Sequence, residues 1–286
     1  MKPSKIKVFS MFSGVGGFEL GFQQANLQTQ VVGFCEIDKY ASQILETKFK
    51  EIKNYGDATK INETKLPNFD ILVGGFPCQP FSMAGKRKGF DEARGTLFFD
   101  VARILAHKKP RNFILENVKG LLSHNKGKTF ETILGILSDL GYIVEWELLN
   151  SKNYGVPQSR ERVYIVGHLR GQSRPKVFSF RKSTEKSNQK PKLLTKNLGQ
   201  AQRVFSTNGI SVSIIALGGG QGAKTGLYEV KKGTQIRRLT PIECERLQGF
   251  PDNWTEGLSD TQRYKCLGNA VTTNVIEWIG KQLYEC

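Results

Sequence analysis

The sequence predicts an α/β fold in which a mostly parallel sheet carries helices on both faces. Short apolar runs alternate with helix-patterned segments throughout the first 170 residues, which is the order expected of such a sheet. The length of 286 residues, with 38% hydrophobic and 24% charged content, is typical of a globular protein with one large domain and room for a small one.

Ten segments of the large domain follow this alternation. Strands are expected at Lys7–Phe12, Gln30–Glu36, Phe69–Val73, Asn112–Glu116, Tyr142–Leu149 and Arg162–Leu169. Helices are expected at Gly17–Ala25, Lys39–Phe49, Thr96–His107 and Thr129–Leu140. The carboxyl ends of parallel strands meet at one edge of the sheet, where ligands and chemistry collect, so the residues after each strand are the functional candidates.

The pattern changes at residue 171 and divides the chain into three regions. Residues 171–240 hold 14 of the 42 basic residues but only 2 of the 26 acidic ones, show no helical period, and predict a small basic, β-rich domain. Residues 1–170 form the large domain. Residues 241–286 complete it, with one helix begun by Thr240, Pro241 and Glu243 and another over Val271–Leu283. The basic block indicates a polyanionic partner, most simply nucleic acid, and a solvated linker is the alternative.

The composition disfavours several other classes of protein. The first 22 residues show neither a secretion signal nor a membrane span. Five scattered cysteines form no disulfide framework or CxxC metal site, and three distant histidines argue against zinc. We therefore expect a cytoplasmic protein without a metal, and a monomer because no segment suggests a dedicated dimer interface.

Cys78 is the candidate nucleophile. It follows the apolar run Ile71–Val73 in a loop held between Pro77 and Pro80, just past the carboxyl end of a predicted strand. A free cysteine is more often a buried small hydrophobe, and that interpretation suits Cys35 and Cys244 within their apolar patterns. It suits Cys78 poorly, because polar residues follow it.

The turn Phe12–Phe18 is the candidate cofactor site. Its glycines let a ligand approach the backbone, although a tight connection without a ligand is the alternative. The dinucleotide fingerprint needs glycine at position 19, where Glu19 would repel a pyrophosphate, so a nicotinamide cofactor is disfavoured. A cofactor with a cationic or zwitterionic end fits better. Glu36 ends the second strand, where an acidic residue commonly binds ribose hydroxyls.

Three more charged residues lie at the same predicted edge. Glu116 ends an apolar strand, so burial should raise its pKa and let it donate a proton or hydrogen bond to a ring nitrogen. Arg160 and Arg162, two residues apart where a strand begins, share one face and could bind a phosphate or a carbonyl oxygen. A surface carboxylate and a surface ion pair with Glu161 are the alternatives.

Six motifs along nearly the whole chain resemble, in their order, those of the DNA (cytosine-5)-methyltransferase family, especially its HhaI-type bacterial modification enzymes. They are Phe12–Phe18, Gly75–Gln79, Glu116–Val118, Gln158–Arg162, the segment from Arg238–Pro241 to Gly249–Pro251, and Gly268–Val271. The resemblance implies a Rossmann-like, S-adenosylmethionine-dependent methyltransferase fold, with residues 171–240 as the target-recognition domain. It also implies methyl transfer to C5 of a cytosine flipped out of a specific short sequence in double-stranded DNA.

The resemblance further implies a role for each site residue. Cys78 would add to C6 of the base, Glu116 would hold N3 and the exocyclic amine, and Arg162, with Arg160 beside it, would hold O2. The implied S-adenosylmethionine site comprises Phe12, Ser13, Gly14, Val15, Gly16, Gly17, Phe18, Glu36, Ile37, Asp57, Ala58, Pro77, Asn269, Ala270 and Val271. The implied DNA contacts are Gln79, Ser82, Gln200, Arg203, Ser213, Gly219 and Gly220.

Alternatives and departures accompany this resemblance. A tRNA (cytosine-5)-methyltransferase of the same fold and a non-catalytic DNA-binding protein are the rival functions, and the basic insert and the presence of Cys78, Glu116 and Arg162 argue against them. Ser213-Ile214 replaces the Thr-Leu pair of the family, and Ala84 replaces a serine. The DNA target therefore stays open, as does the question of whether a cognate restriction endonuclease accompanies the protein or it is a phage or orphan enzyme.

Overall fold

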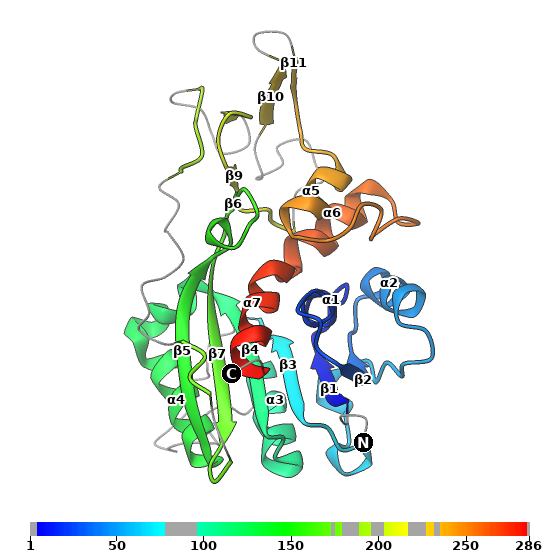
Figure 1. The fold of residues 1–286 in the computed structure, drawn as a ribbon, viewed down its shortest axis with the longest axis vertical. Helices are drawn as coiled ribbons and strands as arrows, with labels where there is room; N and C mark the ends of the chain where they lie inside the picture. Colours follow the sequence, from blue (N-terminus) through cyan, green and yellow to red (C-terminus); the bar gives the residue numbers. More distant parts are fainter. Residues whose placement is uncertain are drawn as a thin grey trace.

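A computed structural model describes residues 5–77, 96–172, 175–178, 189–195, 203–216, 227–231 and 235–284. Its centre is a six-stranded sheet in the order β2-β1-β3-β4-β7-β5 (Figure 1). The strands are β1 (Ile6–Met11), β2 (Thr29–Cys35), β3 (Ile71–Gly75), β4 (Asn112–Val118), β5 (Tyr142–Asn150) and β7 (Glu161–Leu169). Within this sheet only β7 runs against the others, which confirms the mostly parallel α/β fold.

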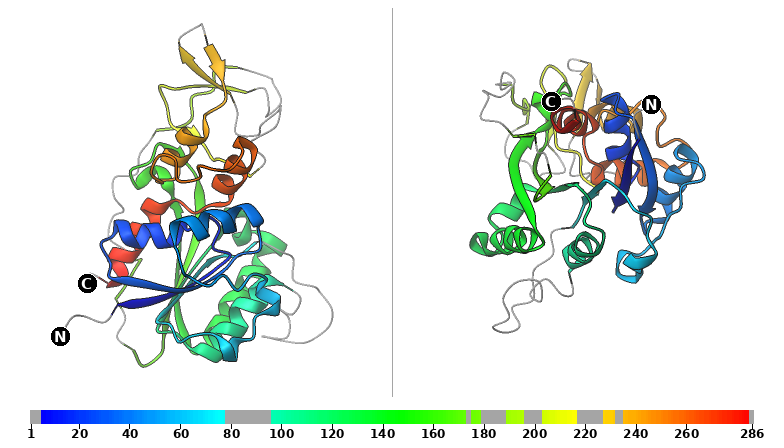
Figure 2. Two further views of the ribbon diagram at one scale, coloured as in Figure 1. Left: turned by 90° about the vertical axis from the view of Figure 1, so that its right-hand side faces the viewer. Right: turned by 60° about the horizontal axis from the view of Figure 1, so that its bottom comes forward.

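Helices cover both faces of the sheet, as two views in Figure 2 show. The helices are α1 (Gly17–Gln24), α2 (Lys39–Lys48), α3 (Leu97–Lys108), α4 (Lys128–Asp139), α5 (Pro241–Leu247), α6 (Asp260–Asn269) and α7 (Thr273–Tyr284). Short 3-10 turns lie at Ala58–Lys60, Glu63–Lys65, Lys119–Leu122, His124–Gly127 and Ser151–Asn153.

The core follows the two-residue period of the strands. Phe9 and Met11 of β1 pack with α3 and α4, while Val8, directly before Phe9, points to the other face and packs with α1 and α7. A third cluster lies beyond the carboxyl edge of the sheet, where α2, α5 and α6 meet and Ile214 joins them. The alternating apolar residues thus separate the two helical layers, and the third cluster supports the edge where function was expected.

Local signals place the helix ends where the sequence predicts them. The Thr240 hydroxyl accepts a hydrogen bond from Glu243 N, and the Glu243 carboxylate accepts one from Thr240 N, which completes the capping box of α5. Gly249 follows the end of α5 with φ of 79°, a conformation that glycine adopts at little cost. Ten predicted segments of the large domain all exist, with ends shifted by one or two residues.

Three elements differ from the prediction. Strand β3 runs on through Gly74 and Gly75. Position 74 needs glycine, because a Cβ there would lie 2.7 Å from the Met11 carbonyl oxygen in the neighbouring strand. Helix α6 was not expected, since its sequence is largely polar and its buried residues, Cys266, Leu267 and Gly268, are confined to its last turn. The last helix begins at Thr273, two residues after the predicted start.

The region between β7 and α5 contains short strands in its described parts. β8 (Val204–Ser206), β10 (Leu227–Lys231) and β11 (Gln235–Arg237) form a three-stranded sheet, and β9 (Ser211–Val212) pairs with β6 (Gln158–Ser159). The β-rich character is therefore confirmed, while the boundaries at 170 and 240 stay a prediction. Among the described residues, no helix has the length and apolar content needed to cross a membrane.

Candidate active site

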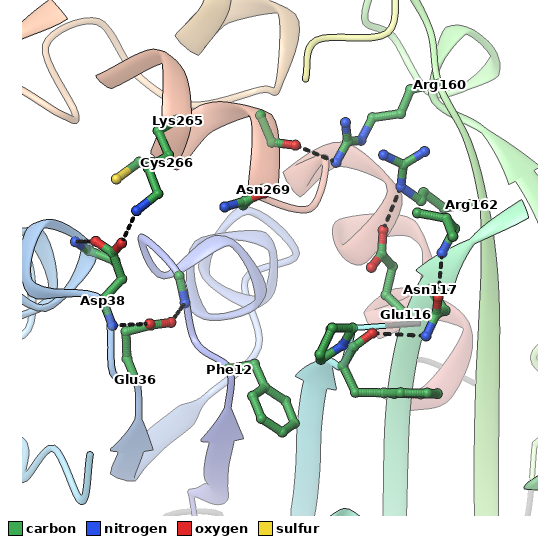
Figure 3. Close-up of a pocket in the computed structure, with 17 residues that line it drawn as sticks. Phe12, Glu36, Asp38, Glu116, Asn117, Arg160, Arg162, Lys265, Cys266 and Asn269 are labelled. Carbon is green, nitrogen blue, oxygen red and sulfur yellow. Dashed lines mark hydrogen bonds and ion pairs between the residues drawn. The ribbon is translucent and has the colours of Figure 1, made fainter. Parts of the chain in front are cut away.

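A pocket of about 360 Å³ lies at the carboxyl edge of the sheet, where the strand order reverses between β1 and β3 (Figure 3). The loops after β1, β2 and β3 reach it together with the end of β4. Because β7 is antiparallel, its first residues lie at the same edge, and Arg162 pairs with Val118. The lining residues are Phe12, Gly14, Glu36, Asp38, Ala41, Gly75, Phe76, Pro77, Glu116, Asn117, Val118, Arg160, Arg162, Lys265, Cys266, Gly268 and Asn269. The volume is in the range of sites for small molecules.

The turn after β1 bends sharply around one side of this pocket. Phe12, Gly14 and Gly16 have φ of 52°, 55° and 83°, a left-handed region that is costly for the side chain of Phe12. Gly14 N donates to Glu36 Oε2 at 2.7 Å, which joins the turn to the end of β2. A Cβ at Gly14 would have no neighbour within 4 Å, so the backbone there is open to a ligand.

Glu36 is the carboxylate on this side of the pocket. Its second oxygen accepts a hydrogen bond from Asp38 N at 2.7 Å, and its burial raises the pKa of the carboxyl group. Each carboxylate oxygen can accept more than one hydrogen bond, so Glu36 can still bind hydroxyl groups. Asp38 in turn caps α2 and pairs with Lys265 Nζ of α6 at 2.5 Å, which closes the pocket wall beside Glu36 (Figure 3).

Glu116 and Arg162 form the opposite side of the pocket. Arg162 Nε lies 3.0 Å from Glu116 Oε1, and the side chains are 16% and 11% exposed. Burial raises the pKa of Glu116, and the nearby charges of Arg162 and Arg160 oppose this rise only in part. The raised pKa confirms the expectation from the apolar strand. A carboxyl group whose pKa is raised is better suited to donate a proton to a ring nitrogen than an ordinary surface carboxylate.

The neighbours of Glu116 fix the start of the loop that follows β3. Asn117 Nδ2 donates to the Phe76 carbonyl oxygen at 2.8 Å, so β4 holds the backbone just before Pro77 (Figure 3). A Cβ at Gly75 would lie 3.2 Å from Glu116 Oε2. The glycine therefore leaves the room that the carboxyl group occupies.

Arg160 also lines the pocket, but its guanidinium group binds carbonyl oxygens of the protein. It donates to Ile214 O at 2.9 Å, Ala270 O at 2.8 Å and Gly268 O at 3.2 Å. Burial, together with the charge of Arg162, lowers the pKa of Arg160 to about 10, which leaves it charged at neutral pH. Arg160 thereby ties the segment around Ile214 to the end of α6.

The sequence-predicted site residues divide into three groups. Those that line the pocket are Phe12, Gly14, Glu36, Pro77, Glu116, Arg160, Arg162 and Asn269. Those that are described but do not line it are Ser13, Val15, Gly16, Gly17, Phe18, Ile37, Asp57, Ala58, Arg203, Ser213, Ala270 and Val271. Those outside the described residues are Cys78, Gln79, Ser82, Gln200, Gly219 and Gly220.

Several described residues correct or refine the expectations. Glu19 is 2% exposed within α1 and does not line the pocket, so the exclusion of a nicotinamide cofactor through its charge does not follow from the structure. Asp57 caps the turn Ala58–Lys60, and hydrogen bonds from Thr59 lower its pKa. Ile37 is 75% exposed and, like Asp57, does not line the pocket.

Sequence reasoning missed Asp38, Lys265 and Cys266 as pocket residues. Asp38 carries a local signal, because an aspartate before a helical segment is a probable N-cap next to Glu36. Lys265 and Cys266 carry none, since α6 itself was not expected and its contact with α2 joins residues more than 200 positions apart. The described residues contain no group of three or more His, Cys, Asp or Glu side chains that could hold a metal ion.

Comparison with known proteins agrees with the motifs. The family description "C-5 cytosine-specific DNA methylase" matches residues 6–213 and 206–285. The Type II methyltransferase M.HhaI of Haemophilus parahaemolyticus is 38% identical, over 96% of this chain and 93% of its own length. M.NgoBI of Neisseria gonorrhoeae is 40% identical over 95% and 90%.

Solved structures show the same fold at lower identity. The DNMT2 mutant structure from Spodoptera frugiperda has a TM-score of 0.76 and 20% identity, and covers 98% of this chain and all of the other. The S. pombe Dnmt2 methyltransferase has a TM-score of 0.74 at 19% identity, with 96% of both chains covered. Since the family description spans nearly the whole chain and the relatives approach 40% identity over both lengths, the chain belongs to the C-5 cytosine-specific DNA methylase family.

Proposed function

We propose that the pocket binds S-adenosylmethionine on its Phe12 and Glu36 side and a flipped-out cytosine on its Glu116 and Arg162 side. The enzyme would thus methylate C5 of cytosine within a specific short sequence of double-stranded DNA. One observation carries the proposal: a single pocket is lined by Glu36, a carboxylate placed to bind ribose hydroxyls, and by the buried ion pair of Glu116 and Arg162.

The described residues fit this cofactor. The open backbone at Gly14 and the remaining acceptor capacity of Glu36 suit a ribose with its hydroxyl groups. Asn269, whose side chain points into the pocket in Figure 3, offers an amide to the amino-acid end. When bound, S-adenosylmethionine supplies an electrophilic methyl group on a sulfonium sulfur.

The base side of the pocket would prepare the cytosine to accept that methyl group. The thiolate of Cys78 adds to C6, while Glu116 donates its proton to N3 and Arg162 hydrogen-bonds O2. Protonation at N3 withdraws electrons from the ring and favours the addition, which leaves C5 nucleophilic. C5 then takes the methyl group that S-adenosylmethionine would supply, and the sulfonium sulfur keeps the electron pair of the broken bond and leaves as the thioether of S-adenosylhomocysteine. Loss of the C5 proton to a base, return of the N3 proton to Glu116 and expulsion of the Cys78 thiolate complete the reaction. Pro77, the described residue before Cys78, supports this assignment because it lines the same pocket as Glu116 and Arg162.

The DNA would bind across the basic region that follows β7. Arg203 is exposed beside β8, where its guanidinium group is available to a guanine edge, and Ser213 lies 3.4 Å from Arg160 Nη1 at the pocket border. The relatives named Type II methyltransferases make a cognate restriction endonuclease the natural functional companion of this enzyme. We expect the chain to act as a monomer.

Base-resolution sequencing of methylated DNA tests the proposal. The purified chain should methylate cytosine in double-stranded DNA only when S-adenosylmethionine is present, and sequencing should give one short motif. Cys78→Ser should abolish methylation, whereas Cys244→Ala, a matched change of a buried thiol outside the pocket, should retain it. Full activity of Cys78→Ser contradicts the covalent mechanism, and methylation of tRNA without DNA would favour the tRNA alternative.

A further inference from the structure

The cofactor turn needs support from outside its own segment. Phe12 has a left-handed φ of 52°, a backbone conformation that is costly for a residue with a side chain and persists only where surrounding structure holds it. The neighbouring strands hold its first half, since Ser13 Oγ donates to Ser10 O at 2.9 Å and Gly14 N donates to Glu36. At the second half, where the turn enters α1, a side chain from a distant segment adds a further contact to the turn's own backbone hydrogen bonds.

That contact comes from Trp254, which is 239 residues away in sequence. The indole Nε1 donates to the carbonyl oxygen of Val15 at 2.8 Å. The indole ring packs edge-on against Phe49 and tilted against Phe250, with centroid distances of 6.2 Å and 5.6 Å. Lys48 Nζ lies 5.0 Å from the ring centre. The indole therefore has a defined position, and its N–H is directed at the middle of the turn.

The loop that carries Trp254 is itself held in place by hydrogen bonds to a buried carboxylate of α5. Glu245 of α5 is fully buried, and its carboxylate accepts hydrogen bonds from Asn253 N and Thr255 N, each at 2.8 Å. Arg263 of α6 neutralises this carboxylate at 3.0 Å. The residues on both sides of Trp254 are thus held by one buried anion, and the loop is a rigid support for the turn.

We propose that Trp254 is a positioning residue for the cofactor: its indole N–H holds the Phe12–Phe18 turn in the conformation that binds S-adenosylmethionine. Trp254 does not line the pocket, so it acts through Val15 rather than by touching the ligand. The inference rests on the proposed cofactor site. It extends that site to the loop after α5, which the sequence motifs did not associate with the cofactor.

The test compares Trp254→Phe with Trp278→Phe. The first keeps an aromatic ring and removes the hydrogen bond, and the second removes an indole from α7, where Trp278 packs on Tyr154 and Phe178 and does not line the pocket. Loss of one buried hydrogen bond predicts that Trp254→Phe raises the dissociation constant and KM for S-adenosylmethionine roughly 2- to 10-fold. In Trp254→Phe, kcat at saturating cofactor and the affinity for DNA should stay within about twofold of the wild type. Trp278→Phe should leave both the dissociation constant and KM for S-adenosylmethionine unchanged.

Hydrogen exchange of the backbone amides separates positioning from general loss of stability. In Trp254→Phe, amides of the 12–18 turn should exchange at least about threefold faster while amides of β4 and β7 keep their protection. Unchanged cofactor affinity, or faster exchange throughout the sheet, overturns the inference. A wild-type chain that neither binds S-adenosylmethionine nor methylates DNA would instead overturn the proposed function, so the two failures are distinguishable.

Discussion

Gly268→Ala tests how closely α6 must approach the segment after β9. A Cβ on Gly268 would lie 2.2 Å from both Ile215 C and Ala216 N, which are backbone atoms and cannot rotate away. To restore an ordinary contact, the segment must move by about 1 Å, a change that close-packed interiors resist. The Arg160 guanidinium, which spans Ile214 O and Gly268 O at 2.9 and 3.2 Å, would lose at least one of these bonds.

The magnitude follows from these two effects. Overpacking costs about 1–3 kcal/mol, and a lost hydrogen bond to a charged group costs about 1.5–3 kcal/mol. We therefore expect Gly268→Ala to lower the free energy of unfolding by about 2.5–6 kcal/mol, which corresponds to a fall in Tm of roughly 4–10 °C for a chain of this size. Chemical denaturation followed by circular dichroism and a thermal scan measure both quantities.

A second glycine serves as the matched control. A Cβ on Gly135 of α4 would have no neighbour within 4 Å, so Gly135→Ala should be neutral or stabilise the protein by up to about 1 kcal/mol through helix propensity. If Gly268→Ala unfolds within about 1 kcal/mol of the wild type, the close approach is not required, and the role of Arg160 as a tie between these segments is wrong.

Three further outcomes follow from the site and the core. Glu116→Gln should slow methyl transfer about 10²- to 10⁴-fold in single-turnover assays, while cofactor affinity stays within about twofold. Because burial raises the pKa of Glu116, the wild-type rate should fall as pH rises through that pKa. An unchanged rate in the variant would contradict the proton-donor role. Burial raises the pKa of Glu19 from 4.5 to about 7, so the stability that this carboxyl contributes is present below pH 4.5 and lost as pH rises through about 7. Glu19→Gln should therefore match the wild type at pH 4 and exceed it by about 3 kcal/mol at pH 8 in urea denaturation, and a pH-independent difference would refute this. Arg203→Ala should weaken binding to the target sequence by about 1–3 kcal/mol and relax its base preference in competition assays, whereas retention of both would remove Arg203 from the base contacts.

The architecture was largely predictable from local sequence. Apolar runs separated by helix-patterned segments determine strands and helices within their own lengths, and the order of the elements determines a mostly parallel sheet. Glu36 and Glu116 were found because each directly follows or ends an apolar run, so their place at the sheet edge is a consequence of the chain itself. Helix α6 was missed because a polar segment that buries only its last turn has no apolar stripe to read.

The partners of the side chains were decided by the tertiary structure. Arg160 belongs to a motif expected to contact the cytosine base, yet its guanidinium group binds the carbonyl oxygens of residues 214, 268 and 270. No pattern in the sequence predicts these partners. Lys265 reaches Asp38, and Trp254 reaches Val15, across more than 200 residues each. Local periodicity and residue type along the chain are enough to predict the fold, the family motifs and the chemical groups at the edge of the sheet. Which of those groups remain free for a ligand was decided only when distant segments packed together, because a hydrogen bond depends on distance in space and not on separation along the chain.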